Sequence, residues 1–177
     1  MSTKIELKNF KHFPSLSEET YCFTATLVIN DIKCGEAKNQ GCGGSTDVWH
    51  NNTEKGKNLF KQAEDYCLTL PPYFIGKFST IDMNLENYVD SIVDKLVREK
   101  AKALDEKRLH KKMLNAILIG NEKDYTYWSY SMSLADLIQK HPQKFITDLK
   151  ELYTKYAVDG NKLLNTNIPQ QFLNQLN

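Results

Sequence analysis

Residues 20–30 read TYCFTATLVIN, and this stretch decides the fold because it predicts the most regular β-strand of the chain. Its odd-numbered positions form one apolar face, made of Tyr21, Phe23, Ala25, Leu27 and Ile29. Its even-numbered positions hold smaller or polar side chains. A period of two among β-branched and aromatic residues is typical of a strand that buries one face.

The segments on either side of this strand predict its partners. Asn30 and Asp31 follow it, and both residue types accept the positive φ of a two-residue type I′ turn. Residues 32–38 then form the second strand of a hairpin. Residues 4–10 alternate apolar and charged side chains and add a third strand. Residues 1–50 are therefore expected to hold an antiparallel β-ribbon of about three strands, ending in a Gly-rich loop.

Residues 54–113 are expected to be helical. Residues 54–70 have helical spacing and stop at Pro71-Pro72. The clearest stripe repeats at i, i+3, i+4 and i+7 and consists of Leu85, Tyr88, Val89, Ile92, Val93, Leu96 and Val97. Asn84 is a natural N-cap, and Asp90 and Asp94 lie on the far side of the stripe. Beyond residue 97 the stripe thins into a basic run.

The C-terminal third predicts a second hairpin and more helices. Residues 114–131 are apolar and aromatic runs around Gly120-Asn121, which indicate a hairpin with a longer loop. Residues 133–177 predict helices, with Ser133 as a cap and Pro142 at a first helical position. The fold class is α+β, and 177 residues that are 41% hydrophobic fit a single domain, 1–177.

The charge balance and the cysteines limit the classes of function. The chain has 23 Lys and Arg against 22 Asp and Glu, which disfavours nucleic acid as a partner. It has neither a signal peptide nor about 18 consecutive apolar residues, so we expect a cytoplasmic protein that does not engage a membrane. The cysteines form no Cys-x-x-Cys pair, and Cys34, Cys42 and His50 lack zinc-knuckle spacing. We expect no metal and no cofactor.

Residues 39–52, NQGCGGSTDVWHNN, predict an irregular loop that is neither a helix nor a good strand. The candidate ligand-binding residues in it are Gly41, Cys42, Gly43, Gly44, Ser45 and Thr46. Successive glycines let neighbouring N–H groups converge on a phosphate. The alternative is a tight connector in which glycine relieves positive φ. The flanking Lys38, Trp49 and His50 complete this candidate site, with Lys38 adding positive charge.

The second candidate element is the aromatic run Tyr125, Tyr127 and Trp128. Aromatic faces stack on nucleic-acid bases, and hydroxyl and indole groups reach base edges. The alternative is cross-strand packing within a hairpin. The basic run 98–112 has cations suited to phosphate, but a solvated helix face explains it equally.

Four stretches together carry a resemblance to a known group of proteins. They are KIELKNFKHFPSLSEET with the strand after it, GCGGST, and LENYVDSIVD. They resemble small accessory proteins encoded by tailed bacteriophages and prophages, over residues 4–46 and 85–97. The resemblance implies the cytoplasm of a host cell and carries no catalytic residues across. Small phage proteins of this kind often act on host immunity.

Three functions are consistent with these observations. The first is a phage counter-defence protein that binds and sequesters a nucleotide-derived immune second messenger, such as a cyclic nucleotide or an ADP-ribose derivative. Such a protein would bind the phosphate at residues 41–46 and stack the base on the aromatic run, without catalysing a reaction. We expect it to be a homo-oligomer. The second is a protein-interaction inhibitor of a host immune effector. The third is a small hydrolase or transferase that uses Cys42 or His50.

Overall fold

The computed structural model describes residues 3–75, 79–121 and 124–176. The chain divides into two compact units, Met1–Ala101 (unit 1) and Lys102–Asn177 (unit 2), and each is described by itself. Helix α2 (Leu85–Met113) begins in unit 1 and ends in unit 2. Antiparallel strands and helices occur in both units, which confirms the α+β class. That the whole chain is one domain stays a prediction, because compactness does not say whether the units unfold together.

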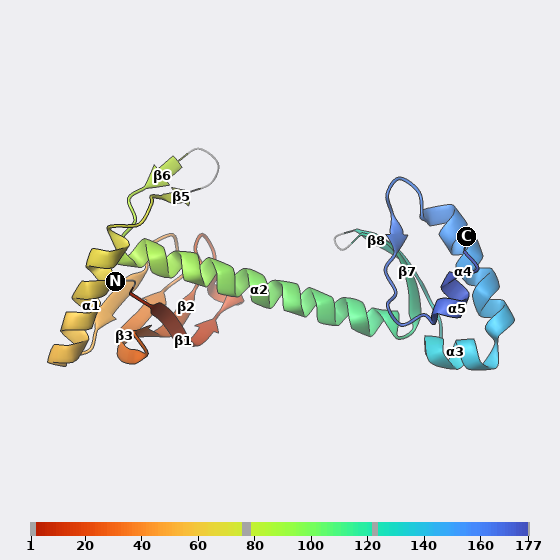
Figure 1. Ribbon diagram of the computed structural model, residues 1–177, viewed down its shortest axis with the longest axis horizontal. Helices are drawn as coiled ribbons and strands as arrows, with labels where there is room; N and C mark the ends of the chain where they lie inside the picture. The colour runs from red at the N-terminus through yellow and green to blue at the C-terminus, as the bar shows by residue number, and fades with distance from the viewer. Residues whose placement is uncertain (1–2, 76–78, 122–123, 177) are drawn as a thin grey trace. The chain divides into compact units, whose positions relative to one another are not determined.

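Unit 1 contains a four-stranded antiparallel sheet (Figure 1). Its strands, in spatial order, are β1 (Ile5–His12), β2 (Phe23–Ile29), β3 (Ile32–Asn39) and β4 (Asp47–His50). The first three confirm the predicted ribbon, and a short 3-10 helix, Pro14–Leu16, lies between β1 and β2. Asn30 and Asp31 have φ values of 49° and 65°, as the predicted hairpin turn requires.

β4 corrects the expectation that residues 39–52 contain no strand. Its pairing runs from Gly35↔His50 to Lys38↔Asp47, so β3 supplies a partner that local composition does not reveal. Gly35 makes this approach possible, because a Cβ there would lie 2.0 Å from the carbonyl oxygen of Trp49. Strand pairing therefore overrides the weak β-propensity of this segment.

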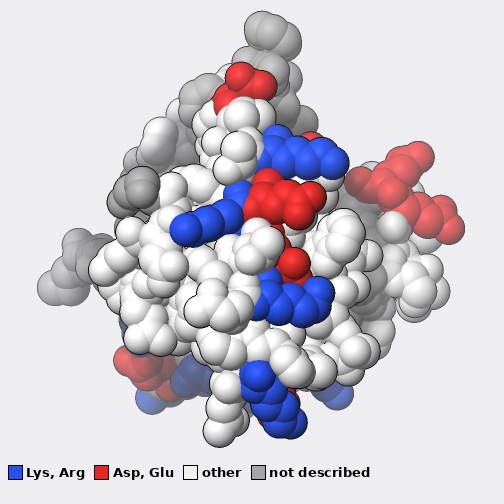
Figure 2. Space-filling view, turned by 90° about the vertical axis from the view of Figure 1, so that its right-hand side faces the viewer, with Lys and Arg blue, Asp and Glu red and all other residues white. Residues whose placement is uncertain are grey.

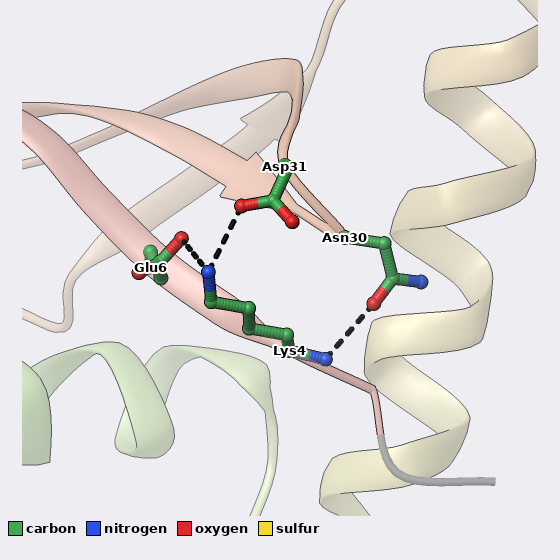
Figure 3. Close-up of polar contacts among 4 residues, drawn as sticks. All are labelled: Lys4, Glu6, Asn30 and Asp31. Carbon is green, nitrogen blue, oxygen red and sulfur yellow. Dashed lines mark hydrogen bonds and ion pairs between the residues drawn. The ribbon is translucent and has the colours of Figure 1, made fainter.

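A group of polar contacts joins the start of β1 to the β2–β3 turn (Figure 3). The ammonium of Lys4 lies 2.9 Å from Asp31 and 3.0 Å from Glu6. The backbone N–H of Lys4 donates to the Oδ1 of Asn30 over 3.0 Å. These ion pairs are exposed, so they contribute little to the stability of the fold.

The core of unit 1 lies between the sheet and two helices, α1 (Glu54–Cys67) and the first turns of α2. Phe23, Leu27 and Ile29 of β2 are at most 1% exposed, which confirms the predicted inner face. The N–H of Asn87 donates to the Oδ1 of Asn84 over 2.7 Å, so the predicted cap of α2 is also confirmed. Between α1 and α2 a small hairpin, β5 (Tyr73–Ile75) and β6 (Ser79–Ile81), was not predicted.

Unit 2 packs three helices on a small antiparallel sheet of order β8-β7-β9. The strands are β7 (Ala116–Gly120), β8 (Tyr125–Ser129) and β9 (Lys162–Leu163), and the helices are α3 (Leu134–Lys140), α4 (Pro142–Tyr156) and α5 (Gln170–Leu173). The hairpin, the Ser133 cap and Pro142 at the start of α4 confirm the predictions. β9 was not predicted, because two residues carry no readable period.

Asn165 completes the edge of β7 beyond the end of β9. It is 7% exposed, its Oδ1 accepts the N–H of Leu118 over 2.7 Å, and its Nδ2 donates to the carbonyl of Ala116 over 2.9 Å. One side chain thus takes the place of a further strand residue.

The surface charges are mixed in sign. The face of the molecule drawn in Figure 2 interleaves basic and acidic side chains over a largely uncharged surface. In the middle of α2, residues 98–108 are all exposed. Within the part of the chain that the structure describes, no helix is both long and apolar enough to cross a bilayer.

Candidate functional site

Asn39, at the end of β3, organises the Gly-rich loop. It is 6% exposed, and its Oδ1 accepts the Thr20 hydroxyl and the N–H of Gly41, both at 2.8 Å. Its Nδ2 donates to the Gly44 carbonyl over 2.9 Å and to the Thr46 hydroxyl over 3.1 Å. Every hydrogen-bonding position of the amide is used, so Asn39 holds both ends of the loop.

The N–H groups of Gly41 and Gly43 donate to neighbouring side chains, and three other N–H groups converge on the Gly41 carbonyl. The N–H groups of residues 18–20 point at the carbonyl oxygen of Gly41, at 2.9, 3.0 and 3.3 Å. The N–H of Gly41 donates to Asn39, and the N–H of Gly43 donates to the Thr20 hydroxyl over 3.3 Å. Gly41 and Gly43 have φ values of 89° and 85°. These facts favour the tight-connector interpretation at Gly41 and Gly43.

The loop is fastened to α2 through Thr46 and Asp90. Thr46 is 2% exposed, and its hydroxyl donates to the Oδ1 of Asp90 while accepting from Asn39. Burial raises the pKa of the Asp90 carboxyl, the Thr46 hydrogen bond opposes that shift, and Glu86 and Asp94 add to it. Asp90 is thus a carboxylate at which positive charge would be favourable.

Two cavities adjoin at Asp90. The first, of about 700 Å³, is lined by Lys38, Ser45, Thr46, Asp47, Val48, Trp49, Asn84, Glu86, Asn87 and Asp90. The second, of about 490 Å³, is lined by Ser17, Glu18, Glu19, Thr20, Tyr21, Phe23, Asn39, Asp90, Val93 and Asp94. Both lie within unit 1. We call them together the acidic groove.

The name describes the charge of the lining. The carboxylates are Glu18, Glu19, Asp47, Glu86, Asp90 and Asp94. Among the described lining residues, Lys38 alone carries a positive charge. Arg98, which is not in the lining, pairs with Asp94 at 2.7 Å. Because the whole chain has a net charge of +1, this local excess of negative charge is a property of the groove rather than of the composition.

Trp49 provides an aromatic surface in the first cavity. It is 40% exposed, and the Lys38 ammonium lies 5.4 Å from the centre of its ring. The strand register that pairs Lys38 with Asp47 and Glu36 with Trp49 positions this pair beside the loop. An exposed indole ring of this kind can bind a cation on its face.

Cys42 and His50 make separate contacts. The exposed Cys42 thiol donates to the Gln40 carbonyl over 3.7 Å. The Nδ1 of His50 lies 2.9 Å from the Asn51 carbonyl oxygen, and its ring stacks edge-on to Phe60 at 5.5 Å. Among the residues the structure describes, His, Cys, Asp and Glu side chains form no cluster of three or more that could hold a metal.

The aromatic run belongs to unit 2 and is therefore described apart from the loop. Tyr127 and Trp128 are 50% and 55% exposed, and Tyr125 is half-buried. The Lys112 ammonium lies 3.7 Å from the centre of the Tyr127 ring and 5.2 Å from that of Tyr125. Tyr127 and Trp128 therefore present aromatic surface to the outside, whereas Tyr125 packs against the small core cluster of Met113, Ala116 and Leu118.

Sequence reasoning found one wall of the groove and missed the other. It selected Lys38, Ser45, Thr46 and Trp49, which line the first cavity. It left out the α2 wall because the polar side of a helix ordinarily faces water. A usable signal was present, since Glu86, Asp90 and Asp94 recur every four residues and share one helix face.

Comparison of this chain with protein-family models, with curated proteins and with solved structures finds no match.

Proposed function

We propose that this protein is a binding protein whose acidic groove holds a positively charged segment of a partner protein, as expected of an inhibitor of a host immune effector. The observation that carries the proposal is the charge of the lining, in which six carboxylates (Glu18, Glu19, Asp47, Glu86, Asp90, Asp94) face one lysine, Lys38. Such a surface attracts cationic groups and speeds their association.

The chemistry of the first cavity suits an arginine or a lysine of the partner. Its guanidinium or ammonium would lie against the Trp49 ring and pair with Asp47 or Glu86. Asp90 supports this at the junction of the two cavities, because an incoming cation favours its ionised form. The second cavity, with Glu18 and Glu19, would take the next basic residue of the same segment.

Fluorescence titration tests the proposal. The chain has two tryptophans, so a Trp128→Phe background leaves Trp49 as the reporter. The probes are a nine-residue peptide of Arg, Lys and Gly and the same peptide with Glu at each basic position. We expect saturable quenching by the basic peptide only, weakening at least about tenfold as salt is raised from 50 to 500 mM.

Variants locate the binding. The double variant Asp47→Asn, Glu86→Gln is expected to weaken the basic peptide at least about tenfold, the effect of losing one to two charge-assisted hydrogen bonds. The matched control is Asp65→Asn, Glu151→Gln, which changes charge equally at exposed positions outside the groove. Equal effects of the two double variants, or no quenching at all, would overturn the proposal.

A second candidate is sequestration of a nucleotide-derived messenger, favoured by the presence of Lys38, Ser45, Thr46 and Trp49 in one cavity. A phosphate there would meet Asp47, Glu86 and Asp90 as well as Lys38, which lowers the expected affinity. Calorimetry against cyclic dinucleotides and ADP-ribose distinguishes the two. Saturable heat that the Lys38→Gln variant abolishes would support sequestration and refute the basic-segment proposal.

A further inference from the structure

β8 forms an outer edge of the unit 2 sheet. It pairs with β7 on one side, and no strand in the described part of the chain pairs with its other side. Its residues, YTYWS, include no charged side chain, and Tyr127 and Trp128 are half exposed on opposite faces. An edge strand presents unpaired N–H and C=O groups that can pair with another strand.

The corresponding edge of unit 1 is protected. β1 carries Glu6, Lys8 and Lys11, its register with β2 shifts between Lys8 and Lys11, and Asn9 has a φ of 53°. Charged side chains and a bulge of this kind prevent edge-to-edge pairing. β8 has neither charged side chains nor a bulge. The β8 edge can therefore pair with another strand, whereas the β1 edge is protected against it.

We propose that β8 is a dimerisation edge, at which two copies of this chain pair their β8 strands antiparallel about Tyr127 and join two three-stranded sheets into one. The occupant is a second copy because the strand is complementary to itself. Pairing about Tyr127 sets Thr126 opposite Trp128 of the second copy, twice by symmetry, and Tyr125 opposite Ser129. Aromatic and β-branched residues are favourable cross-strand partners, and no like charges meet within the strand.

The faces of the sheet agree with this register. Trp128 pairs with Ile117 of β7, and Ile117 is buried in the cluster formed by α3, α4 and α5. The dimer would therefore extend that apolar face with two tryptophans. Tyr127 pairs with Leu118, on the opposite face. On each face of the joined sheet, the exposed aromatic side chain, Trp128 or Tyr127, would thus gain a neighbouring side chain from the second copy.

Lys112 gives the proposed dimer a distinctive salt dependence. Its ammonium lies 3.7 Å from the centre of the Tyr127 ring, so two such ammoniums would share one face near the symmetry axis. They repel each other, and salt screens that repulsion. The dimer is expected to tighten as salt rises, opposite to the basic peptide at the acidic groove.

Sedimentation equilibrium of the whole chain over a concentration series tests the proposal. We expect a monomer–dimer equilibrium that weakens at least tenfold in Tyr127→Lys and in Trp128→Lys, and tightens in Lys112→Gln. Leu114→Lys is the matched control, because Leu114 is an apolar residue of unit 2 that is 61% exposed. Circular dichroism of each variant verifies that it folds.

Cross-linking tests the register itself. In a Cys42→Ser background, which removes the exposed thiol, Tyr127→Cys is expected to form an intermolecular disulfide much faster than Leu114→Cys. A chain that is monomeric throughout, a dimer unaffected by both β8 lysine variants, or equal cross-linking would overturn the proposal. Asp47→Asn, Glu86→Gln should leave dimerisation intact, so the groove and the edge succeed or fail separately.

Discussion

Unit 1 and unit 2 both secure an irregular segment with one buried asparagine, but the surroundings of the two side chains differ. Asn39 binds the Gly-rich loop beside two cavities, whereas Asn165 lies against β7 among packed strands and helices. The first therefore shapes the lining of a cavity, and the second replaces a missing strand. Because a buried asparagine holds a segment in both settings, the cavities around Asn39, and not its amide, single out the proposed binding site.

The largest predicted effects come from removing these amides. Asn39→Ala and Asn165→Ala are each expected to lower the free energy of unfolding by about 3 kcal/mol, because several buried partners lose their hydrogen bonds at once. Urea denaturation measures both. Asn58→Ala, at an exposed position of α1, is the control and should change little. If the free energy of unfolding fell equally at all three positions, the hydrogen bonds of Asn39 and Asn165 would not be the cause of the loss.

A somewhat smaller loss is expected at the strand pair that carries the loop. Gly35→Ala places a Cβ against the Trp49 carbonyl, and forcing the strands apart costs about 2 kcal/mol. The same variant should shift the emission of Trp49, measured in a Trp128→Phe background. If Gly35→Ala changed neither the free energy of unfolding nor the Trp49 emission, β4 would not depend on Gly35.

The pH dependence of unit 1 should differ from that of unit 2 through Asp90. Its pKa is raised in the folded chain, so the folded state binds this proton more tightly than the unfolded state does. The free energy of unfolding should therefore fall as pH rises from the ordinary Asp value, near 3.9, through the raised one. Asp90→Asn keeps an acceptor for the Thr46 hydroxyl and removes this decline. Urea denaturation of the unsubstituted chain and of Asp90→Asn, from about pH 3 to about pH 7, measures this. The two free energies of unfolding should diverge as pH rises.

The smallest effect is expected on the surface of α2. Lys102 pairs with Glu106 at 3.9 Å, with both side chains mostly exposed. Such a pair contributes little, so Lys102→Ala should leave the urea midpoint unchanged within error. A clear loss of stability would show that this charged stretch has a structural role beyond its own turn.

The fold was largely predictable because its strongest signals are local. The period of β2, the Asn30-Asp31 turn and the stripe that begins at Leu85 each follow from neighbouring residues, and the structure confirms them. β4 and β9 escaped prediction because neither short segment has a readable period of its own, and each becomes a strand by pairing with another, β3 and β7 respectively. The charge of the groove was harder to predict than the spacing on α2 alone suggests, because Glu18, Asp47 and Glu86 come from three separate segments that line the two adjoining cavities only after folding.

The exposed middle of α2 has a consequence for how the chain opens. Residues 98–108 have no buried side chain, so their backbone hydrogen bonds are protected only by the helix itself and by pairs such as Lys95–Glu99 and Arg108–Asp105. Amide hydrogens in this stretch should exchange with deuterium orders of magnitude sooner than those of β2 or β7. Because the stretch is rich in lysine and arginine, trypsin should make its first cut there, before either sheet opens.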